Sequence, residues 1–211
     1  MNFLYRCGWL FFCALFRVYF RGRVCGADNV PPTGPVILAA NHASFLDPPF
    51  VGSALHRPLF YLARASLFRK PLLGWLLPRW NSIPVDRDGG NAAGLRVIMD
   101  RLASGAGIIL FPEGTRSFDG NLQPARSGIG LIAAKTDAPV VPVRICGSFE
   151  AWGRNCILPR PKPIVVKFGS SMRFESLRAE AKNCSRARLR EIYSQIANEI
   201  MAAIAKLPRD L

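Results

Sequence analysis

The 211-residue chain carries 28 lysines and arginines against 14 aspartates and glutamates, a formal net charge of +14, and 50% of its residues are hydrophobic. This composition excludes a disordered chain, which would be poorer in apolar residues, and the length suits one domain with a sizeable core. A basic and apolar protein suits an anionic membrane surface better than nucleic acid, because its aromatic residues gather in apolar runs instead of alternating with basic ones.

The first 24 residues predict a helix that lies in the membrane interface. Residues 7–16 form an uncharged, aromatic-rich run, with arginines at 6, 17, 21 and 23 around it; the run is about half the length that crosses a bilayer. A signal peptide and a helix of the protein core are the alternatives, although no small-residue cleavage site follows the run. We expect the arginines to meet the headgroups. The side chains expected in the lipid are Phe3, Leu4, Trp9, Leu10, Phe11, Phe12, Phe16, Tyr19 and Phe20.

After a loop at residues 28–35, the predicted elements alternate between strands and helices. Short apolar runs predict strands at 36–40, 59–63, 83–85, 107–111, 140–145 and 164–168. Helical spacing of apolar residues predicts a helix at 91–104, capped by Asn91, and a last helix that begins near Ser185. This alternation predicts an α/β fold with a mixed, largely parallel sheet flanked by helices. We expect residues 1–24 to be a membrane anchor and residues 25–211 to be the catalytic domain.

Residues 65–80 are apolar but include Arg69, Lys70 and Arg79. A segment of this kind suits the membrane surface or the wall of a groove for an acyl chain. The alternative is a core helix whose basic ends reach water.

His42 and Asp47 are the first candidate catalytic residues, because they follow directly on the predicted strand 36–40. An aspartate that accepts one imidazole N–H fixes the tautomer and leaves the other ring nitrogen free to take a proton. The chain has no Gly-x-Ser-x-Gly elbow, and Ser44 lies too near His42 in sequence to be a convincing nucleophile. The pair therefore suits a hydroxyl that belongs to a substrate.

The second candidate site is the Phe-Pro-Glu-Gly-Thr-Arg-Ser block at residues 111–117, which follows the predicted strand 107–111. The guanidinium of Arg116, the hydroxyls of Thr115 and Ser117 and the backbone N–H groups of a turn at Gly114 together suit a phosphate. Glu113 would repel a phosphate unless its carboxylate held Arg116 or a substrate hydroxyl. An ordinary turn with an ion pair is the alternative.

Together these blocks resemble the glycerophosphate and lysophosphatidic acid acyltransferase family, whose members share Asn-His-x-x-x-x-Asp and Phe-Pro-Glu-Gly-Thr-Arg-Ser. Residues 83–87 are similar to a third family block, in which Arg87 matches an arginine assigned to the acceptor, and Val-Pro-Val at 141–143 resembles a fourth. The resemblance covers about residues 25–170. In one departure, Arg126 stands where many relatives have a phosphate-binding lysine, and the two side chains differ in geometry.

The resemblance implies the fold of glycerol-3-phosphate acyltransferases and the transfer of a fatty acyl group from acyl-coenzyme A or acyl-carrier protein to the sn-2 hydroxyl of lysophosphatidic acid. It implies His42 and Asp47 as catalytic residues. The implied substrate-binding residues are Arg87, Glu113, Gly114, Thr115, Arg116 and Arg126. We expect no cofactor and no metal, since the six cysteines lack zinc-site spacing.

Three further readings concern the acceptor, the activity and the location. The acceptor could be another lysophospholipid, a lyso-aminolipid or glycerol 3-phosphate, and a non-catalytic lipid-binding protein is the alternative from another class. We expect a monotopic or peripheral protein on the cytoplasmic face of the cell membrane, with lysophosphatidic acid, the thioester donor and the anionic membrane as its partners and no nucleic acid.

Overall fold

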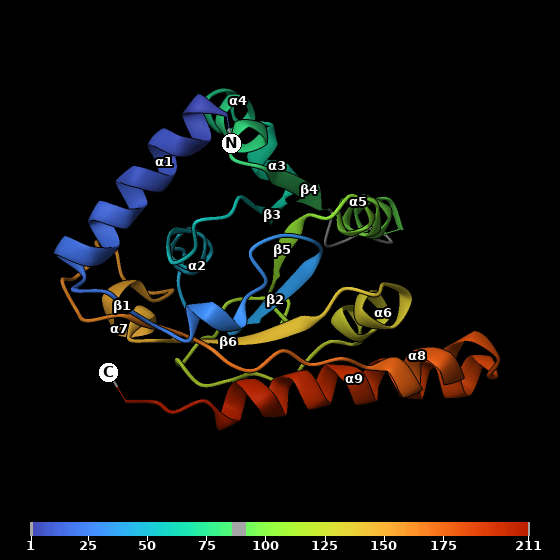
Figure 1. Cartoon of the computed structure of the whole chain (residues 1–211). Coiled ribbons are helices and arrows are strands. Elements are labelled where there is room, and N and C mark those ends of the chain that lie inside the picture. The colour runs from blue at the N-terminus through green and yellow to red at the C-terminus, as the bar shows by residue number, and fades with distance from the viewer. Residues whose placement is uncertain (1, 86–91, 211) are drawn as a thin grey trace.

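The computed structural model describes residues 2–85 and 92–210, in which seven strands form one sheet with the order β1-β7-β6-β2-β5-β3-β4 (Figure 1). Neighbouring strands are parallel except β6 and β7, which are antiparallel. The strands are β1 (Arg23–Cys25), β2 (Val36–Ala40), β3 (Leu59–Arg64), β4 (Ser82–Val85), β5 (Gly107–Leu110), β6 (Val140–Cys146) and β7 (Val165–Phe168). The expected mixed, largely parallel sheet is thus confirmed.

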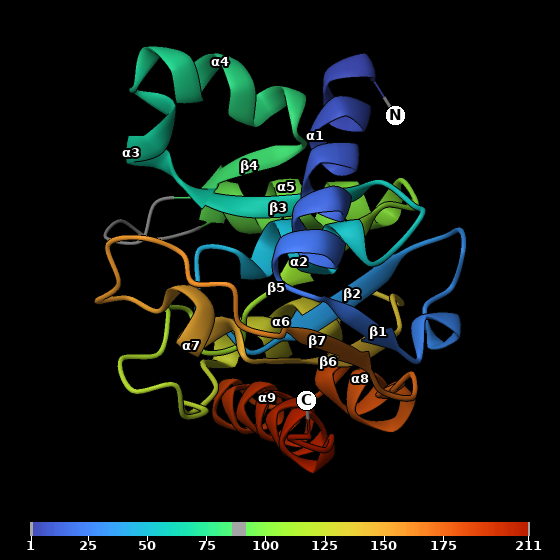
Figure 2. The ribbon, with the colours of Figure 1, turned by 90° about the vertical axis from the view of Figure 1, so that its left-hand side faces the viewer.

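Helices cover both faces of the sheet. The first half of the chain provides α1 (Phe3–Ala14), η1 (Leu15–Tyr19), η2 (Ala27–Asn29), α2 (Asp47–Ser53), α3 (Ala65–Phe68), α4 (Pro71–Arg79) and α5 (Ala92–Ala103). The second half provides α6 (Ser127–Lys135), α7 (Ser148–Trp152), α8 (Glu175–Lys182) and α9 (Arg186–Lys206). Figures 1 and 2 show α1 and α2 on one side of the sheet and α5, α6 and α9 on the other. The sheet is therefore the middle layer of three.

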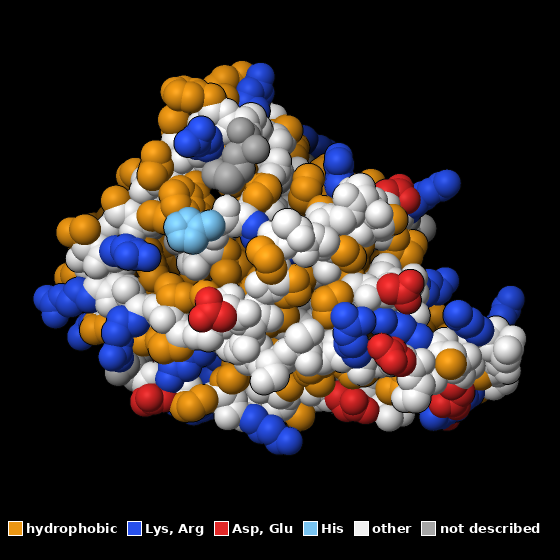
Figure 3. Space-filling view, in the orientation of Figure 1, with side chains coloured by type: hydrophobic (Ala, Val, Ile, Leu, Met, Phe, Trp, Pro, Cys, Tyr) orange, Lys and Arg blue, Asp and Glu red, His pale blue; other side chains and the backbone are white. Residues whose placement is uncertain are grey.

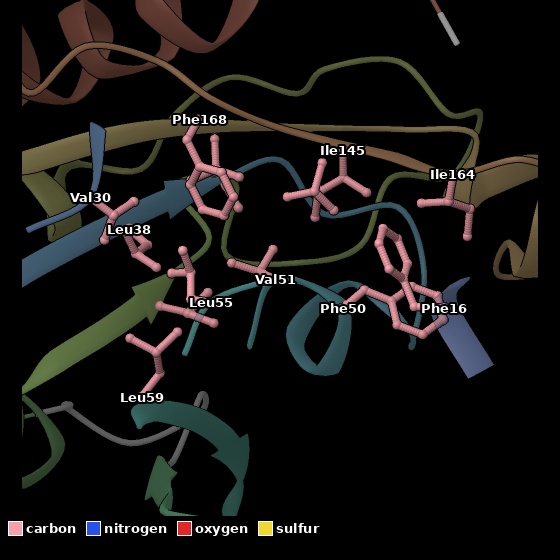
Figure 4. Close-up of a cluster of buried hydrophobic side chains, with 14 of the residues drawn as sticks. Phe16, Val30, Leu38, Phe50, Val51, Leu55, Leu59, Ile145, Ile164 and Phe168 are labelled. Carbon is pink, nitrogen blue, oxygen red and sulfur yellow. The ribbon is translucent and has the colours of Figure 1, made fainter. Parts of the chain in front are cut away.

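The central strand β2 is buried along its whole length. Its alternate side chains point to opposite faces: Leu38 joins the core beneath α2, whereas Ile37 joins the core beneath α5, α6 and α9. Figure 4 shows part of the first core, where the rings of Phe16 and Phe50 lie side by side with centroids 5.1 Å apart. A strand covered on both faces has a continuous run of apolar residues in its sequence. The bounds of β2 therefore match the predicted strand 36–40.

Helix α1 is docked onto the domain by polar groups on one side. Asn2 caps it by accepting from the N–H of Tyr5 at 2.7 Å. The Tyr5 hydroxyl accepts from the N–H of Leu59, and the Trp9 indole donates to the Leu55 carbonyl at 3.0 Å. Among the residues 2–85 and 92–210, no helix is long and apolar enough to cross a membrane.

The expectation that all the N-terminal aromatic residues enter the lipid is wrong for two of them. Phe16 and Phe20 are each only 1% exposed, because they pack with Phe50 in the core. By contrast, Phe3, Leu10 and Phe11 remain exposed at 59–79%. The exposed apolar side chains of this segment therefore lie along α1, whereas Phe16 and Phe20, near its C-terminal end, are buried in the core.

The alternative interpretation, in which residues 65–80 form a core helix, is also wrong. None of the residues of α3 and α4 is buried, and Leu72 and Trp75 are 71% and 49% exposed. Figure 1 shows both helices beyond the β3–β4 edge of the sheet, next to the N-terminal end of α1. Their position leaves the apolar side chains open to a further partner.

The remaining expectations concern the element ends. The predicted strands lie within one residue of the observed bounds, and Ser185 caps α9 by accepting from the N–H of Arg188 at 3.2 Å. The expected cap Asn91 lies outside the described residues. Strand β1, which pairs with β7 at the sheet edge, was not predicted.

Candidate active site

His42 and Asp47 meet at the carboxyl end of β2. The turn that follows the strand brings His42 Nδ1 to 2.9 Å from Asp47 Oδ2. The side chain of Asp47 is fully buried and that of His42 is 12% exposed. In the tautomer that donates Nδ1–H to the carboxylate, Nε2 is the free, proton-accepting nitrogen. The predicted pair is therefore formed, with the geometry of a base and the group that orients it.

The backbone of the same turn holds the Asp47 carboxylate in place. Oδ2 accepts from the N–H groups of Ala43 and Ser44 at 2.6 and 2.7 Å, in addition to the histidine. Asp47 also begins α2, where the helix dipole favours a negative charge. These contacts hold the carboxylate in position, and the carboxylate in turn orients the imidazole.

The Ser44 hydroxyl is not placed to act as a nucleophile. Its side chain is fully buried, and its hydroxyl donates to the Trp152 carbonyl at 2.7 Å and accepts from the N–H of Leu46. The hydroxyl therefore organises the turn and faces away from solvent. This geometry agrees with a reaction in which the attacking hydroxyl comes from a substrate.

The second block clamps the peptide of His42. The N–H of Ser117 donates to the His42 carbonyl at 2.7 Å, and the backbone N–H of His42 donates to the Glu113 carboxylate. The Phe111 ring stacks on the imidazole with a centroid distance of 4.0 Å and an angle of 21°. The second block thus holds both the backbone and the ring of His42.

Glu113 is 3% exposed, and burial raises the pKa of its carboxyl from 4.5 to about 7. Hydrogen bonds from the backbone N–H groups of Gln123 and His42 oppose this shift, whereas the nearby Asp47 charge adds to it. The buried Glu113 side chain therefore connects the second block to the backbone of His42 and Gln123. Because its carboxyl is partly neutral near pH 7, Glu113 repels a phosphate less than a fully ionised carboxylate would.

Two of the expected phosphate-binding arginines flank the turn of the second block. The guanidinium carbon of Arg116 lies 3.4 Å from the centroid of the Phe45 ring. Gly114 has a φ of +68°, and a Cβ atom there would lie 2.8 Å from Cδ of Arg126. The glycine therefore permits both the left-handed turn and the close approach of Arg126.

The other expected residues divide into three cases. Thr115 lies between Gly114 and Arg116 in the turn, half-buried. The Ser117 hydroxyl is hydrogen-bonded within the protein, to the Asp119 carboxylate and the Asn121 carbonyl. Arg87 lies outside the described residues.

Asn41, Phe45 and Phe111 belong to the site but were missed. The amide of Asn41 exchanges two hydrogen bonds with the backbone of Ile145, at 2.7 and 3.0 Å, and so ties the end of β2 to β6. Both Asn41 and Phe111 stand inside the sequence blocks that mark the site. Phe45, which is 58% exposed, carried no separate sequence signal.

The fold and this site define an α/β protein with a histidine–aspartate pair and a basic turn at the carboxyl edge of its strands. A sequence profile of the family described as Acyltransferase matches residues 21–146. The chain belongs to this acyltransferase family.

Individual relatives carry more specific names. The chain is 33% identical over 144 residues to a 1-acyl-sn-glycerol-3-phosphate acyltransferase of Chlamydomonas reinhardtii, covering 66% of this chain and 42% of the relative. A protein of the same name from Limnanthes alba is 36% identical over 138 residues, covering 63% and 48% of the two chains. The chain thus spans about half or less of the length of these curated relatives.

The fold is also similar to that of a solved structure. The crystal structure of the 1-acyl-sn-glycerophosphate (LPA) acyltransferase PlsC from Thermotoga maritima superposes with a TM-score of 0.69 at 24% identity, covering 98% of this chain and 80% of that one.

Proposed function

We propose that the protein transfers a fatty acyl group from acyl-coenzyme A or acyl-carrier protein to the sn-2 hydroxyl of lysophosphatidic acid, forming phosphatidic acid in phospholipid biosynthesis. The observation that carries the proposal is the buried Asp47 carboxylate, which lies 2.9 Å from His42 Nδ1. The names of the relatives support the acceptor.

His42 acts as the general base. Nε2 takes the proton of the acceptor hydroxyl while Asp47 stabilises the imidazolium that forms. The acceptor oxygen attacks the thioester carbonyl, and the tetrahedral intermediate collapses with cleavage of the carbon–sulfur bond. The proton on His42 passes to the departing thiolate, so the ester, the free thiol and the neutral histidine are the products. The transfer is direct and needs no acyl-enzyme.

The arginines hold the acceptor phosphate. Arg116 and Arg126 flank the Gly114 turn, and Arg87 is the third arginine of the proposed site. Charge-assisted hydrogen bonds to a phosphate fix its position, and a fixed phosphate places the acceptor hydroxyl near the base. Thr115 adds a hydroxyl, while Glu113 positions the peptide of His42.

The membrane is the proposed partner of α1 and α4. Figure 3 shows hydrophobic side chains, interspersed with lysines and arginines, along the side of the molecule that carries these helices. Phe3, Leu10, Phe11, Leu72 and Trp75 are the large exposed apolar side chains on them. Monotopic attachment to the cytoplasmic face would bring the lipid acceptor and the thioester donor to one site.

A panel of acceptors and donors tests the proposal. Purified protein in detergent is offered lysophosphatidic acid, other lysophospholipids, a lyso-aminolipid and glycerol 3-phosphate, each with acyl-coenzyme A and with acyl-carrier protein. We expect phosphatidic acid as the main product, and a His42→Ala control that forms almost none. A preference for a different acceptor, or binding without turnover, would contradict the proposal.

A further inference from the structure

The loop at residues 153–163, between α7 and β7, presents two adjacent aliphatic side chains to solvent. Ile157 is 92% exposed and Leu158 is 73% exposed. The loop also carries Arg154, Arg160 and Lys162, all exposed, and it contains no acidic residue. Two neighbouring aliphatic side chains without cover, flanked only by positive charge, are unusual for a surface that meets water alone.

Hydrogen bonds hold this loop in its exposed position. The N–H of Arg160 donates to the Ala151 carbonyl at 2.7 Å, and the N–H of Cys156 donates to the Gly153 carbonyl at 3.1 Å. The Trp152 indole donates to the Cys156 carbonyl at 3.1 Å. The two aliphatic residues are therefore displayed by an organised turn.

The loop adjoins the end of the N-terminal helical segment. The Tyr19 hydroxyl donates to the Pro159 carbonyl at 3.0 Å. Tyr19 is 40% exposed and its neighbour Val18 is 80% exposed. The exposed side chains of η1 thus lie next to the loop, on the part of the molecule away from α4 (Figure 2).

The same loop lies beside the candidate active site. The guanidinium of Arg154 lies 4.0 Å from the ring centroid of Phe118, which directly follows the second sequence block. The Trp152 ring, one residue before the loop, lies 5.9 Å from that of Phe45. Phe45 and Phe118 are 58% and 64% exposed. The loop therefore lies next to η1 and also next to Phe45 and Phe118 beside the candidate site.

We propose that the 153–163 loop is a second membrane-docking element, which inserts Ile157 and Leu158 into an anionic bilayer while its three basic side chains bind the headgroups. Apolar insertion with basic side chains at headgroup level is the chemistry of interfacial attachment. Two contacts, at α1 and at the loop, fix the tilt of the domain, so that the candidate site beside the loop faces the bilayer surface. The inference adds a contact to the membrane attachment proposed above.

An acidic carrier protein is the competing occupant of this surface. The basic side chains would suit its charge equally well. The membrane is favoured because Tyr19, next to the exposed Val18 of η1, is hydrogen-bonded to Pro159, which directly follows the aliphatic pair. A carrier protein would account for the charge but not for exposed apolar side chains on both neighbouring segments.

Vesicle co-sedimentation at fixed salt tests the proposal without any turnover. The Ile157→Ser/Leu158→Ser variant should need at least about tenfold more phosphatidylglycerol-containing vesicles for half binding than the parent protein. Arg160→Gln/Lys162→Gln should weaken binding about fivefold per charge at low salt and much less at high salt. The matched controls are Val97→Ser on α5 and Arg186→Gln/Arg190→Gln at the start of α9, which lies at the opposite end of the molecule from α7 (Figure 1).

Quenching by brominated lipids reports insertion directly. Leu158→Trp should add fluorescence that brominated acyl chains quench, whereas Val97→Trp should add fluorescence that they do not. Parent-like vesicle binding by the aliphatic variant, or added fluorescence in Leu158→Trp that the brominated chains leave unquenched, would overturn the inference. If the aliphatic variant instead lost activity only with acyl-carrier protein, the surface would belong to the carrier. Because vesicle binding is measured without turnover, these results can be interpreted even if the proposed acyltransferase activity fails.

Discussion

Asp47→Asn separates the electrostatic role of Asp47 from its structural role. In the native protein, Oδ2 accepts from the N–H groups of Ala43 and Ser44 and lies 2.9 Å from His42 Nδ1. An amide oxygen in the same position keeps the two backbone hydrogen bonds. It carries no charge, however, so it cannot stabilise the imidazolium that forms when His42 takes the acceptor proton.

The expected losses differ between activity and stability. Without a negative charge to stabilise the imidazolium, turnover should fall about 10²–10⁴-fold, which corresponds to roughly 3–5 kcal/mol of activation free energy. Folding stability should change little in Asp47→Asn. Asp47→Ala should lose similar activity and also unfold more easily, because two buried backbone N–H groups lose their acceptor at about 1–3 kcal/mol each.

The assay combines steady-state kinetics at saturating donor and acceptor with thermal unfolding of each variant. His42→Ala is the control for loss of the base, and His42→Ala/Asp47→Asn should be no slower than His42→Ala alone, since the two residues act as a unit. An Asp47→Asn enzyme with near-normal turnover would refute the base mechanism. Additive losses in the double variant would show that Asp47 acts independently of His42, and a trapped acyl-enzyme would exclude direct transfer.

Three further outcomes are expected. Arg116→Ala should raise the KM of the acceptor far more than that of the donor, by the loss of charge-assisted hydrogen bonds of roughly 1.5–3 kcal/mol each; a mainly donor effect would assign Arg116 to the donor. Phe45→Leu should raise the acceptor KM only about two- to fivefold, because it removes a cation–π contact and leaves the charge. Glu113→Gln should gain folding stability relative to the parent as pH rises from 4.5 to about 7, and no more above it, because the raised pKa of Glu113 means that the folded parent retains a proton that the unfolded chain has lost. Chemical denaturation of both proteins across this range measures the difference, and a constant difference would contradict the raised pKa.

The fold could be predicted where burial and sequence pattern coincide. β2 is covered on both faces, so its five residues form an unbroken apolar run whose bounds are visible in the sequence. β1 shows the opposite case. Its residues Arg23–Cys25 are exposed or half-buried, and only pairing with β7 makes them a strand. Such an edge strand has no pattern of its own to detect.

The candidate site divides in the same way. His42 and Asp47 are five residues apart in one turn, so local geometry makes their contact predictable. The clamp on His42 from Glu113 and Ser117 depends on β2 and β5 lying side by side. That proximity is a property of the sheet, and no pattern in either segment reveals it.

The inward packing of Phe16 and Phe20 changes how the membrane anchor must be tested. Deleting residues 1–24 would remove both rings from a core that also holds Phe50. Loss of a buried phenylalanine costs about 3–5 kcal/mol, so two such losses approach the roughly 5–15 kcal/mol that stabilises a typical domain. A truncated protein that failed to bind vesicles could simply be unfolded. Leu10→Ser/Phe11→Ser changes only exposed side chains, so it should weaken vesicle binding at unchanged thermal stability, and unchanged vesicle binding would place the anchor elsewhere than on α1.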